Sequence, residues 1–451
     1  MILIDDRPVD LILALAVLMI VGLAIYGIVM LLLSRRDPAA ARRRAQMDSP
    51  NPQLSVVFVV PCLNEERVLA ASLDRLTALD WHDLHVLVVD DGSDDATAQI
   101  VRDHADPRVQ LLQRTLPEAR HGKGEALNAA IRHLRSGAVV SIRQSQNVIV
   151  CVMDADGRLE PDVLKKVLPL FSSRSLGAVQ VGVRINNRRD SLLARMQDIE
   201  FVLYTEVFQR GRRHLGSVGL GGNGQFVRLA ALESVEGPWT RSLAEDLDLG
   251  LRLHLEAWRI EFCSATSVHQ QGIVSLRAWI RQRTRWFQGH LQTWPLVPSV
   301  LDGLRGTRRA DLFYHMTSPA LLLIGSLLSL AFFLWMAEFL LSLVAGTLRF
   351  SPWWISAYLF AFGVTLLLGA VYWLREAPGL VGAVRTLGWL HVFVFYATLW
   401  YLAGWNAVLR TLRGHSSWSK TERNDDDLRF ASENEAASAA EVRLPSGGAA
   451  R

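Results

Sequence analysis

An uncharged apolar run that ends in two aspartates is the feature of this sequence that most restricts its fold. Residues Val148–Met153 are all Val, Ile, Cys or Met, and Asp154 and Asp156 follow them directly. Such a run predicts a strand covered on both faces of a parallel sheet. Ligands of open α/β sheets bind beyond the carboxyl ends of the strands, where the two aspartates fall. Their oxygens suit a divalent cation, although a solvated turn with two surface acids would look the same.

Other strand-like runs alternate with helical patterns, which include 192–207 and 245–255. The predicted strands lie at 54–60, 84–89, 108–113, 148–153, 177–185 and 259–263. This alternation predicts a mostly parallel, doubly wound α/β sheet. Cys62, Cys151 and Cys263 have neither zinc spacing nor a disulfide framework, so we expect reduced core residues.

Apolar windows long enough to cross a bilayer flank this region. Half of the 451 residues are hydrophobic, and crossings are predicted at 11–33, 317–344, 354–374 and 384–408. The first is longer than the apolar region of a signal peptide, and its basic residues, Arg35–Arg44, follow it. They predict an N-terminus outside the cell and a cytosolic location for the region that follows. Three later crossings would leave the C-terminus outside although 410–423 is basic, so either one segment does not fully cross or the charge rule fails.

The sequence therefore predicts a multi-pass protein of the cell membrane. The expected parts are a membrane helix (1–34), a basic linker (35–53), a cytosolic domain (54–274), amphipathic interface helices (275–312), a membrane region of about three helices (313–410) and a tail with a disordered end (411–451). The net charge is +4, and the basic clusters lie beside apolar segments. They favour membrane lipids over nucleic acid as partners.

Acidic and basic residues at the expected edge of the sheet indicate a nucleotide site. Asp90 and Asp91 end one predicted strand and could accept hydrogen bonds from a base or a ribose, or could only cap a turn. Lys123, between two glycines at a helix start, suits a diphosphate, although exposed lysines beside turns are common. Glu245 and Asp246 begin a helix and could supply a general base, or could only complement the helix dipole.

A second set of candidates lies on the Arg- and Trp-rich helix expected at 275–294. Gln282, Arg285 and Trp286 fall on one side of this helix. There they could offer a cation to a leaving diphosphate and a flat ring to a sugar. The same composition is typical of a helix anchored in the membrane interface, and both interpretations can hold together.

Together these motifs resemble family 2 glycosyltransferases, in particular the membrane-embedded group that contains the cellulose, hyaluronan, chitin and poly-N-acetylglucosamine synthases. The resemblance covers about residues 56–294. Seven pieces appear in the family's order: PCLNEE, DDGS, GKGEALN, DAD, GGNGQF, AED and QRTRW.

The resemblance implies a GT-A fold and a nucleotide-activated sugar donor, UDP being the usual nucleotide. The implied donor contacts are Glu65, from PCLNEE, Asp90 or Asp91 for the base, and Lys123 for the diphosphate. Asp154 and Asp156 would hold Mg²⁺ or Mn²⁺, and Asp246, with Glu245 beside it, would be the general base. Gln282, Arg285 and Trp286 match Q-x-x-R-W, which would hold nucleotide and acceptor.

The implied activity is inverting, processive synthesis of a β-linked extracellular or capsular polysaccharide. The partners expected with it are a secretion partner or further copies of the chain in a homo-oligomer. Two alternatives are a transferase that adds one sugar to a lipid carrier and, less favoured, a catalytically silent scaffold that binds nucleotide for a partner polymerase. Ala244 stands where the family's T-E-D motif has Thr. The loop 221–226 lacks the cysteine of the cellulose and chitin enzymes, so the sugar is open.

Overall fold

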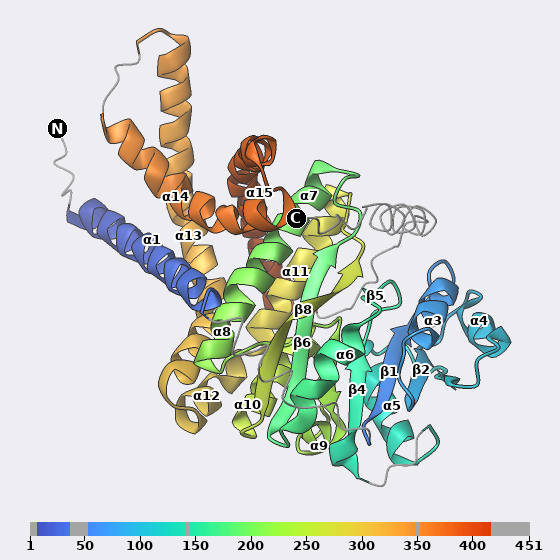
Figure 1. Ribbon diagram of the computed structural model, residues 1–451. Helices are drawn as coiled ribbons and strands as arrows, with labels where there is room; N and C mark the ends of the chain where they lie inside the picture. Colours follow the sequence, from blue (N-terminus) through green and yellow to red (C-terminus); the bar gives the residue numbers. More distant parts are fainter. Residues whose placement is uncertain (1–6, 37–52, 140–143, 348–351, 416–451) are drawn as a thin grey trace, which may run out of the picture.

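The computed structural model describes residues 7–36, 53–139, 144–347 and 352–415 (Figure 1). Most of the predicted basic linker and most of the predicted tail lie outside these ranges. An eight-stranded mixed sheet forms the centre of the catalytic region. Its order is β3 Val109–Gln113, β2 Leu84–Asp90, β1 Ser55–Cys62, β4 Val148–Val152, β7 Gln225–Arg228, β6 Leu176–Ile185, β8 Arg259–Gln270 and β5 Arg158–Leu159.

The sheet is less parallel than the sequence predicts. Strands β3, β2, β1 and β4 are parallel, but β7 runs antiparallel to both β4 and β6, and β5 runs antiparallel to β8. Gln225, the first residue of β7, pairs with Val152, the last residue of β4. Because β7 is reversed, the Gly-rich loop before it lies at the edge where Asp154 follows β4.

Helices cover both faces of the sheet, as a doubly wound arrangement requires. Val56, Phe58 and Val60 of β1 face one core with the first group of helices, and Val57 and Val59 face the second. The first group is α3 Leu69–Thr77, α4 Thr97–Asp103, α6 Val163–Val167 and the 3₁₀ turn Leu168–Ser172; the second is α5 Lys123–Arg135, α9 Leu229–Glu233 and α10 Glu245–Leu255, with the 3₁₀ turn Ser145–Asn147 before β4. All three cysteines are buried, as predicted for core residues.

The remaining helices lie to one side of the sheet, and Figure 1 shows α7 and α11 between the sheet and the C-terminal helices. Leu192–Leu203 is α7, and a π-helix at Tyr204–Gln209 continues it where the sequence predicts one α-helix. The others are α1 Arg7–Ser34, α8 Arg210–Leu215, α11 Leu276–Gln292, the 3₁₀ turn Trp294–Leu296, α12 Val297–Gly303, α13 Gly306–Val344, α14 Pro352–Glu376 and α15 Leu380–Leu412.

The helices expected to cross a membrane form, and among the described residues one of them is long and apolar enough to span a bilayer. In the part of the chain that the structure describes, α15 is long and apolar enough to cross a bilayer, and a shorter apolar stretch, Leu18–Ser34, lies in α1. Apolar side chains such as Leu380 and Val384 of α15 are exposed. The other three crossings, and with them the multi-pass topology, stay predictions.

Helix α11 is more enclosed than the predicted interface helix. Trp279, Arg283 and Phe287 are buried where α11 packs against α13 and α15. The Arg- and Trp-rich face therefore lies inside the molecule, between the catalytic region and the C-terminal helices. Arg277 and Arg281, on the other side of α11, are exposed.

Candidate active site

A cavity of about 440 Å³ begins at the carboxyl ends of β1 and β4 and extends to α7, α11 and α15. Nine of the eleven predicted site residues line it. They are Glu65, Asp91, Lys123, Asp154, Glu245, Asp246, Gln282, Arg285 and Trp286. Asp90 and Asp156 are not among the lining residues.

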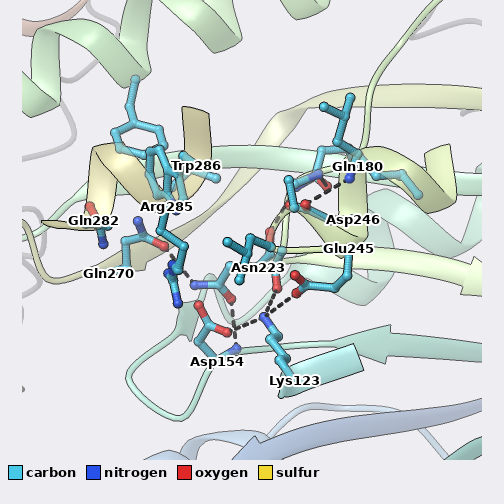
Figure 2. Close-up of a pocket in the computed structure, with 18 of the residues that line it drawn as sticks. Lys123, Asp154, Gln180, Asn223, Glu245, Asp246, Gln270, Gln282, Arg285 and Trp286 are labelled. Carbon is cyan, nitrogen blue, oxygen red and sulfur yellow. Dashed lines mark hydrogen bonds and ion pairs between the residues drawn. The ribbon is translucent and has the colours of Figure 1, made fainter. Parts of the chain in front are cut away.

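Lys123 joins the two acidic parts of the cavity (Figure 2). Gly122 precedes α5 with a positive φ of 108°, a conformation that favours glycine, so Lys123 begins the helix at the cavity. Its Nζ donates to Asp154 Oδ1 at 2.6 Å and to the Gly222 carbonyl at 2.8 Å, and lies 3.8 Å from Glu245 Oε1. Burial alone would lower the pKa of Lys123, but Asp154 and Glu245 outweigh burial and raise it. The side chain is therefore an ammonium group suited to a diphosphate.

The Gly-rich loop before β7 completes the floor of the site. A Cβ on Gly222 would lie 3.2 Å from Lys123 Nζ and 3.3 Å from Asp246 Oδ2, so a larger residue there would crowd both charged groups. Asn223 follows, and its Oδ1 accepts the Asp154 N–H at 3.2 Å. This hydrogen bond fixes the loop against the residue that begins the D-x-D motif.

Three polar residues that the sequence analysis missed hold this loop. Gln180 Nε2 donates to the Asn223 carbonyl at 2.9 Å, and Gln180 Oε1 accepts the Gly221 N–H at 2.8 Å. Asn223 Nδ2 donates to Gln270 Oε1 at 3.0 Å. Gln180 interrupts the apolar run of β6. This was the sign in the sequence of a polar cluster at the site, because a buried amide needs polar partners.

Glu245 and Asp246 open α10 at the cavity wall. Burial raises the pKa of Glu245 to about 7 although Lys123 opposes the shift, and burial also raises the pKa of Asp246. Asp246 Oδ1 accepts the Leu247 N–H at 2.8 Å. A carboxylate with a raised pKa is a stronger base than an ordinary surface aspartate, which is what removal of a hydroxyl proton requires.

The two D-x-D aspartates occupy different positions. Asp154 lines the cavity, whereas Asp156 is 4% exposed and its Oδ2 accepts the Gln271 N–H at 3.4 Å. Within the described ranges, no group of three or more His, Cys, Asp or Glu side chains could hold a metal ion. Two carboxylates still fit a Mg²⁺ or Mn²⁺ ion whose remaining ligands are substrate phosphates and water.

The structure separates the roles of Asp90 and Asp91. Asp90 is fully buried, and its carboxylate accepts hydrogen bonds from the Ser93 N–H at 2.9 Å and from Gln113 Nε2 at 3.3 Å. Asp90 therefore stabilises the turn, which is the alternative to nucleotide binding that the sequence analysis left open. Asp91 lines the cavity and forms an ion pair with Arg114. Burial raises the pKa of Asp91, with Arg114 opposing the shift. Of the two acids, Asp91 is therefore placed to meet a nucleotide base.

Helix α11 brings Gln282, Arg285 and Trp286 to the opposite wall of the cavity (Figure 2). Ser275 caps this helix by accepting the Ala278 N–H at 3.5 Å. Gly289 lets α11 approach α10, because a Cβ there would lie 2.6 Å from Ala244 Cβ. A donor bound at the strand ends would thus have cationic groups on two sides, from Lys123 and Arg285.

Comparison with known proteins agrees with this geometry. The model of the family described as "Glycosyltransferase like family 2" matches residues 52–289, more than half of the chain. A mannosyltransferase from Pyrobaculum calidifontis, solved in complex with GDP-mannose and Mn²⁺, shares the fold with a TM-score of 0.53 at 19% identity, over 88% of this chain and 99% of that one.

The fold and the site define a GT-A type glycosyltransferase. The chain belongs to family 2 of these enzymes. The "Beta-monoglucosyldiacylglycerol synthase" of Trichormus variabilis is 34% identical over 277 residues, which are 59% of this chain and 56% of that protein. The "Probable glycosyltransferase YdaM" of Bacillus subtilis is 28% identical over 82% of this chain and 87% of its own length. The chain thus spans little more than half the length of the glycolipid synthase.

These relatives correct one expectation. The sequence motifs suggested the cellulose- and chitin-synthase group, whereas the 34% identical relative reported above carries the name of a glycolipid synthase.

Proposed function

We propose that this protein is an inverting glycosyltransferase that moves one sugar from a nucleotide donor to the hydroxyl group of a neutral glycerolipid such as diacylglycerol. The observation that carries the proposal is the course of the cavity. It runs from Lys123 and Asp154 at the strand ends to Trp400 on α15, the helix that is apolar enough to cross a membrane. An acceptor that resides in a bilayer could reach the donor along this course. The name of the 34% identical relative supports the same substrate class.

The proposed reaction is a direct displacement. Asp246 accepts the proton of the lipid hydroxyl, whose oxygen forms a bond to the anomeric carbon while the bond from that carbon to the diphosphate oxygen breaks. The nucleoside diphosphate leaves with both electrons of that bond, and Lys123 and Arg285 offset its charge. An α-linked donor then gives a β-linked product.

Asp154 and Asp156 would hold a divalent cation that neutralises the diphosphate, and Asp91 with Glu65 would lie beside the nucleoside. We place the enzyme at the cell membrane with the catalytic region in the cytosol. In this function, α11 orients the lipid acceptor, and binding of a growing polymer by α11 is not required. The relatives reported above do not support the polysaccharide product that the motifs first suggested.

The test is transfer by full-length protein in detergent, with UDP-glucose, UDP-N-acetylglucosamine, UDP-galactose and GDP-mannose as donors. Each is assayed with Mg²⁺ or Mn²⁺, with EDTA, and with or without diacylglycerol. We expect one donor to give a singly glycosylated lipid by mass spectrometry. A product of high mass made without lipid would reject the proposal in favour of a polymerase.

Two matched variants of α10 test the base. Asp246→Asn should lower transfer 10²- to 10⁴-fold, about the usual contribution of a general base. Asp248→Asn is the control, because Asp248 lies on the same helix, does not line the cavity and pairs with Arg252 at 3.7 Å. Nucleotide binding without turnover by the unmodified protein would instead indicate a scaffold.

A further inference from the structure

An ion pair with a buried arginine and a partly buried glutamate lies beside Trp286, at the end of the cavity away from the strand ends. Arg283 of α11 is 0% exposed, and its Nη2 donates to Glu200 Oε2 of α7 at 2.8 Å. The Q-x-x-R-W pattern leaves residue 283 unspecified, so the motif gives neither member of the pair a role. A buried charge requires further interactions to offset its lost hydration.

Aromatic rings supply those interactions to the arginine. The guanidinium carbon of Arg283 lies 3.9 Å from the centroid of the Trp286 ring and 5.1 Å from that of Trp400. Trp279 and Phe201 follow at 5.5 and 5.8 Å. A cation that close to a ring face fixes the plane of the ring. The orientation of Trp286 in the cavity therefore depends on the position of Arg283.

Helix α15 supplies the interactions of the glutamate. Tyr396 donates its hydroxyl hydrogen to Glu200 Oε2 at 2.6 Å, and Trp400 Nε1 donates to Glu200 Oε1 at 3.1 Å. Trp279 of α11 donates to the Tyr396 hydroxyl at 3.1 Å. Glu200 thus ties α7, α11 and α15 together through both of its oxygens.

Glu200, Trp286 and Trp400 all line the cavity beyond the catalytic acids. We infer that Arg283 and Glu200 are positioning residues that set Trp286 and Trp400 as the two aromatic walls of an acceptor subsite, so that α15 forms part of the active site. This inference rests on the proposed lipid acceptor. The flat walls suit the uncharged glycerol backbone of a lipid, because the charges of Arg283 and Glu200 behind them neutralise one another.

The decisive variant is Tyr396→Phe, which keeps the ring and removes one hydrogen bond to Glu200. Loss of a hydrogen bond to a charged group should raise the KM for diacylglycerol about tenfold, with the KM for the donor and nucleotide release without acceptor unchanged. Tyr401→Phe is the matched control. It makes the same change on the same helix, where the Tyr401 hydroxyl is 3.0 Å from Ser329 Oγ.

Glu200→Gln should raise the same KM, and the double variant with Tyr396→Phe should be no worse than the more affected single variant, since both act through one group. Hydrogen exchange of residues 276–292 is measured in parallel, and should be faster in Tyr396→Phe than in Tyr401→Phe. Faster exchange in Tyr396→Phe with an unchanged KM for diacylglycerol would show that Arg283 and Glu200 only hold the helices together, which would overturn the inference.

The exchange measurement separates the two proposals. If the unmodified protein glycosylates no lipid, the proposed function fails. Faster exchange in Tyr396→Phe would then still support the positioning of α11 by the pair, whereas exchange equal to that of Tyr401→Phe would reject it.

Discussion

Lys123 is the residue on which the charge balance of the site depends. Its ammonium group contacts Asp154 and lies near Glu245, and all three side chains are partly buried in the cavity wall. The same cation can serve a diphosphate, because that ligand would bring new negative charge to the same place.

Replacing Lys123 by Met should therefore lower kcat/KM for the donor at least 10²-fold, about the effect of removing one preorganised donor to a developing charge. Steady-state nucleotide release measures the change. Lys165→Met is the control, because Lys165 is an exposed lysine paired with Asp80 at 3.0 Å. A loss of less than tenfold in the Lys123 variant would show that Arg285 alone offsets the leaving charge.

His254 gives a prediction about stability and pH. Burial lowers the pKa of His254 to about 4, and its Nε2–H lies 2.9 Å from the Val218 carbonyl. The unfolded chain takes up a proton near the ordinary value of 6.5, whereas the folded protein does not until about pH 4. The stability that neutral His254 supports is therefore complete above pH 6.5 and declines as the pH falls towards 4.

At about pH 5 this decline amounts to about 2 kcal/mol. Thermal unfolding from about pH 7 to about pH 5 should show a smaller loss in Tm for His254→Gln than for the unmodified protein. Parallel Tm profiles would place the pH sensitivity elsewhere.

For single residues, the sequence predicted where most of the site residues lie but not which contacts each side chain makes. Strand ends and helix starts placed Lys123, Asp154 and Asp246 together, because parallel strands present their carboxyl ends at one edge. Whether Asp90 faces a ligand or its own turn depends on contacts with Ser93 and Gln113, which spacing does not encode. Gln180 and Gln270 were missed because their partners lie more than 40 residues away.

Among the elements, α10 and α11 have a contact that bears directly on catalysis. Gly289 of α11 faces Ala244, the residue before Glu245 and Asp246. The small side chain at 244, where the family motif has Thr, fits this close approach. The distance between the acids on α10 and Arg285 on α11 thus depends on two small residues.

Gly289→Ala should push the two helices apart. We expect a loss of about 1–3 kcal/mol in stability from overpacking and a fall in kcat of about tenfold or more. Gly388→Ala is the control, since Gly388 also lies in a helix but its added Cβ would meet nothing within 4 Å. Unfolding in detergent and transfer rates measure both effects, and equal behaviour of the two variants would contradict the prediction.

The sequence predicted the longer elements and missed two local ones. The helix 245–255 was predicted with the bounds observed for α10. Strand β7 is only four residues long and follows several glycines, so its pattern is too short to recognise. The π-helix after α7 has no breaker residue, and its register depends on packing against α1 and α8.

For the whole molecule, a buried polar network joins the first helix to the catalytic region and to α13. Asp311 of α13 accepts hydrogen bonds from Tyr26 of α1 at 2.8 Å and from Ser217 at 2.7 Å. Arg212 Nε of α8 lies 3.2 Å from Asp311 Oδ2, and both side chains are almost fully buried.

Asp311→Ala would leave the Arg212 charge buried without its carboxylate, so we expect a loss of about 3–5 kcal/mol in stability. The thermal midpoint in detergent should fall clearly. Asp302→Ala, which changes an exposed acid, should leave it unchanged. Equal midpoints for the two variants would show that Tyr26 and Arg212 do not depend on Asp311.

At this scale hydropathy predicted where the long helices lie but not how they pack. The Arg and Trp residues of α11 are typical of a helix in the membrane interface, and the sequence predicts one there. In the structure, Arg283 is buried and forms an ion pair with Glu200, which lies 83 residues away in the sequence. Such a pairing depends on tertiary contacts that periodicity does not contain.

The order of the strands has a consequence for the newly synthesised chain. Strand β7 separates β4 from β6, and the cavity draws on residues from Pro61 to Trp400. A ribosome would finish Asp154 long before Asp246, Arg285 or Trp400, so a partly made chain lacks residues that complete the cavity. The whole active site would thus exist only after the last long helix has been synthesised.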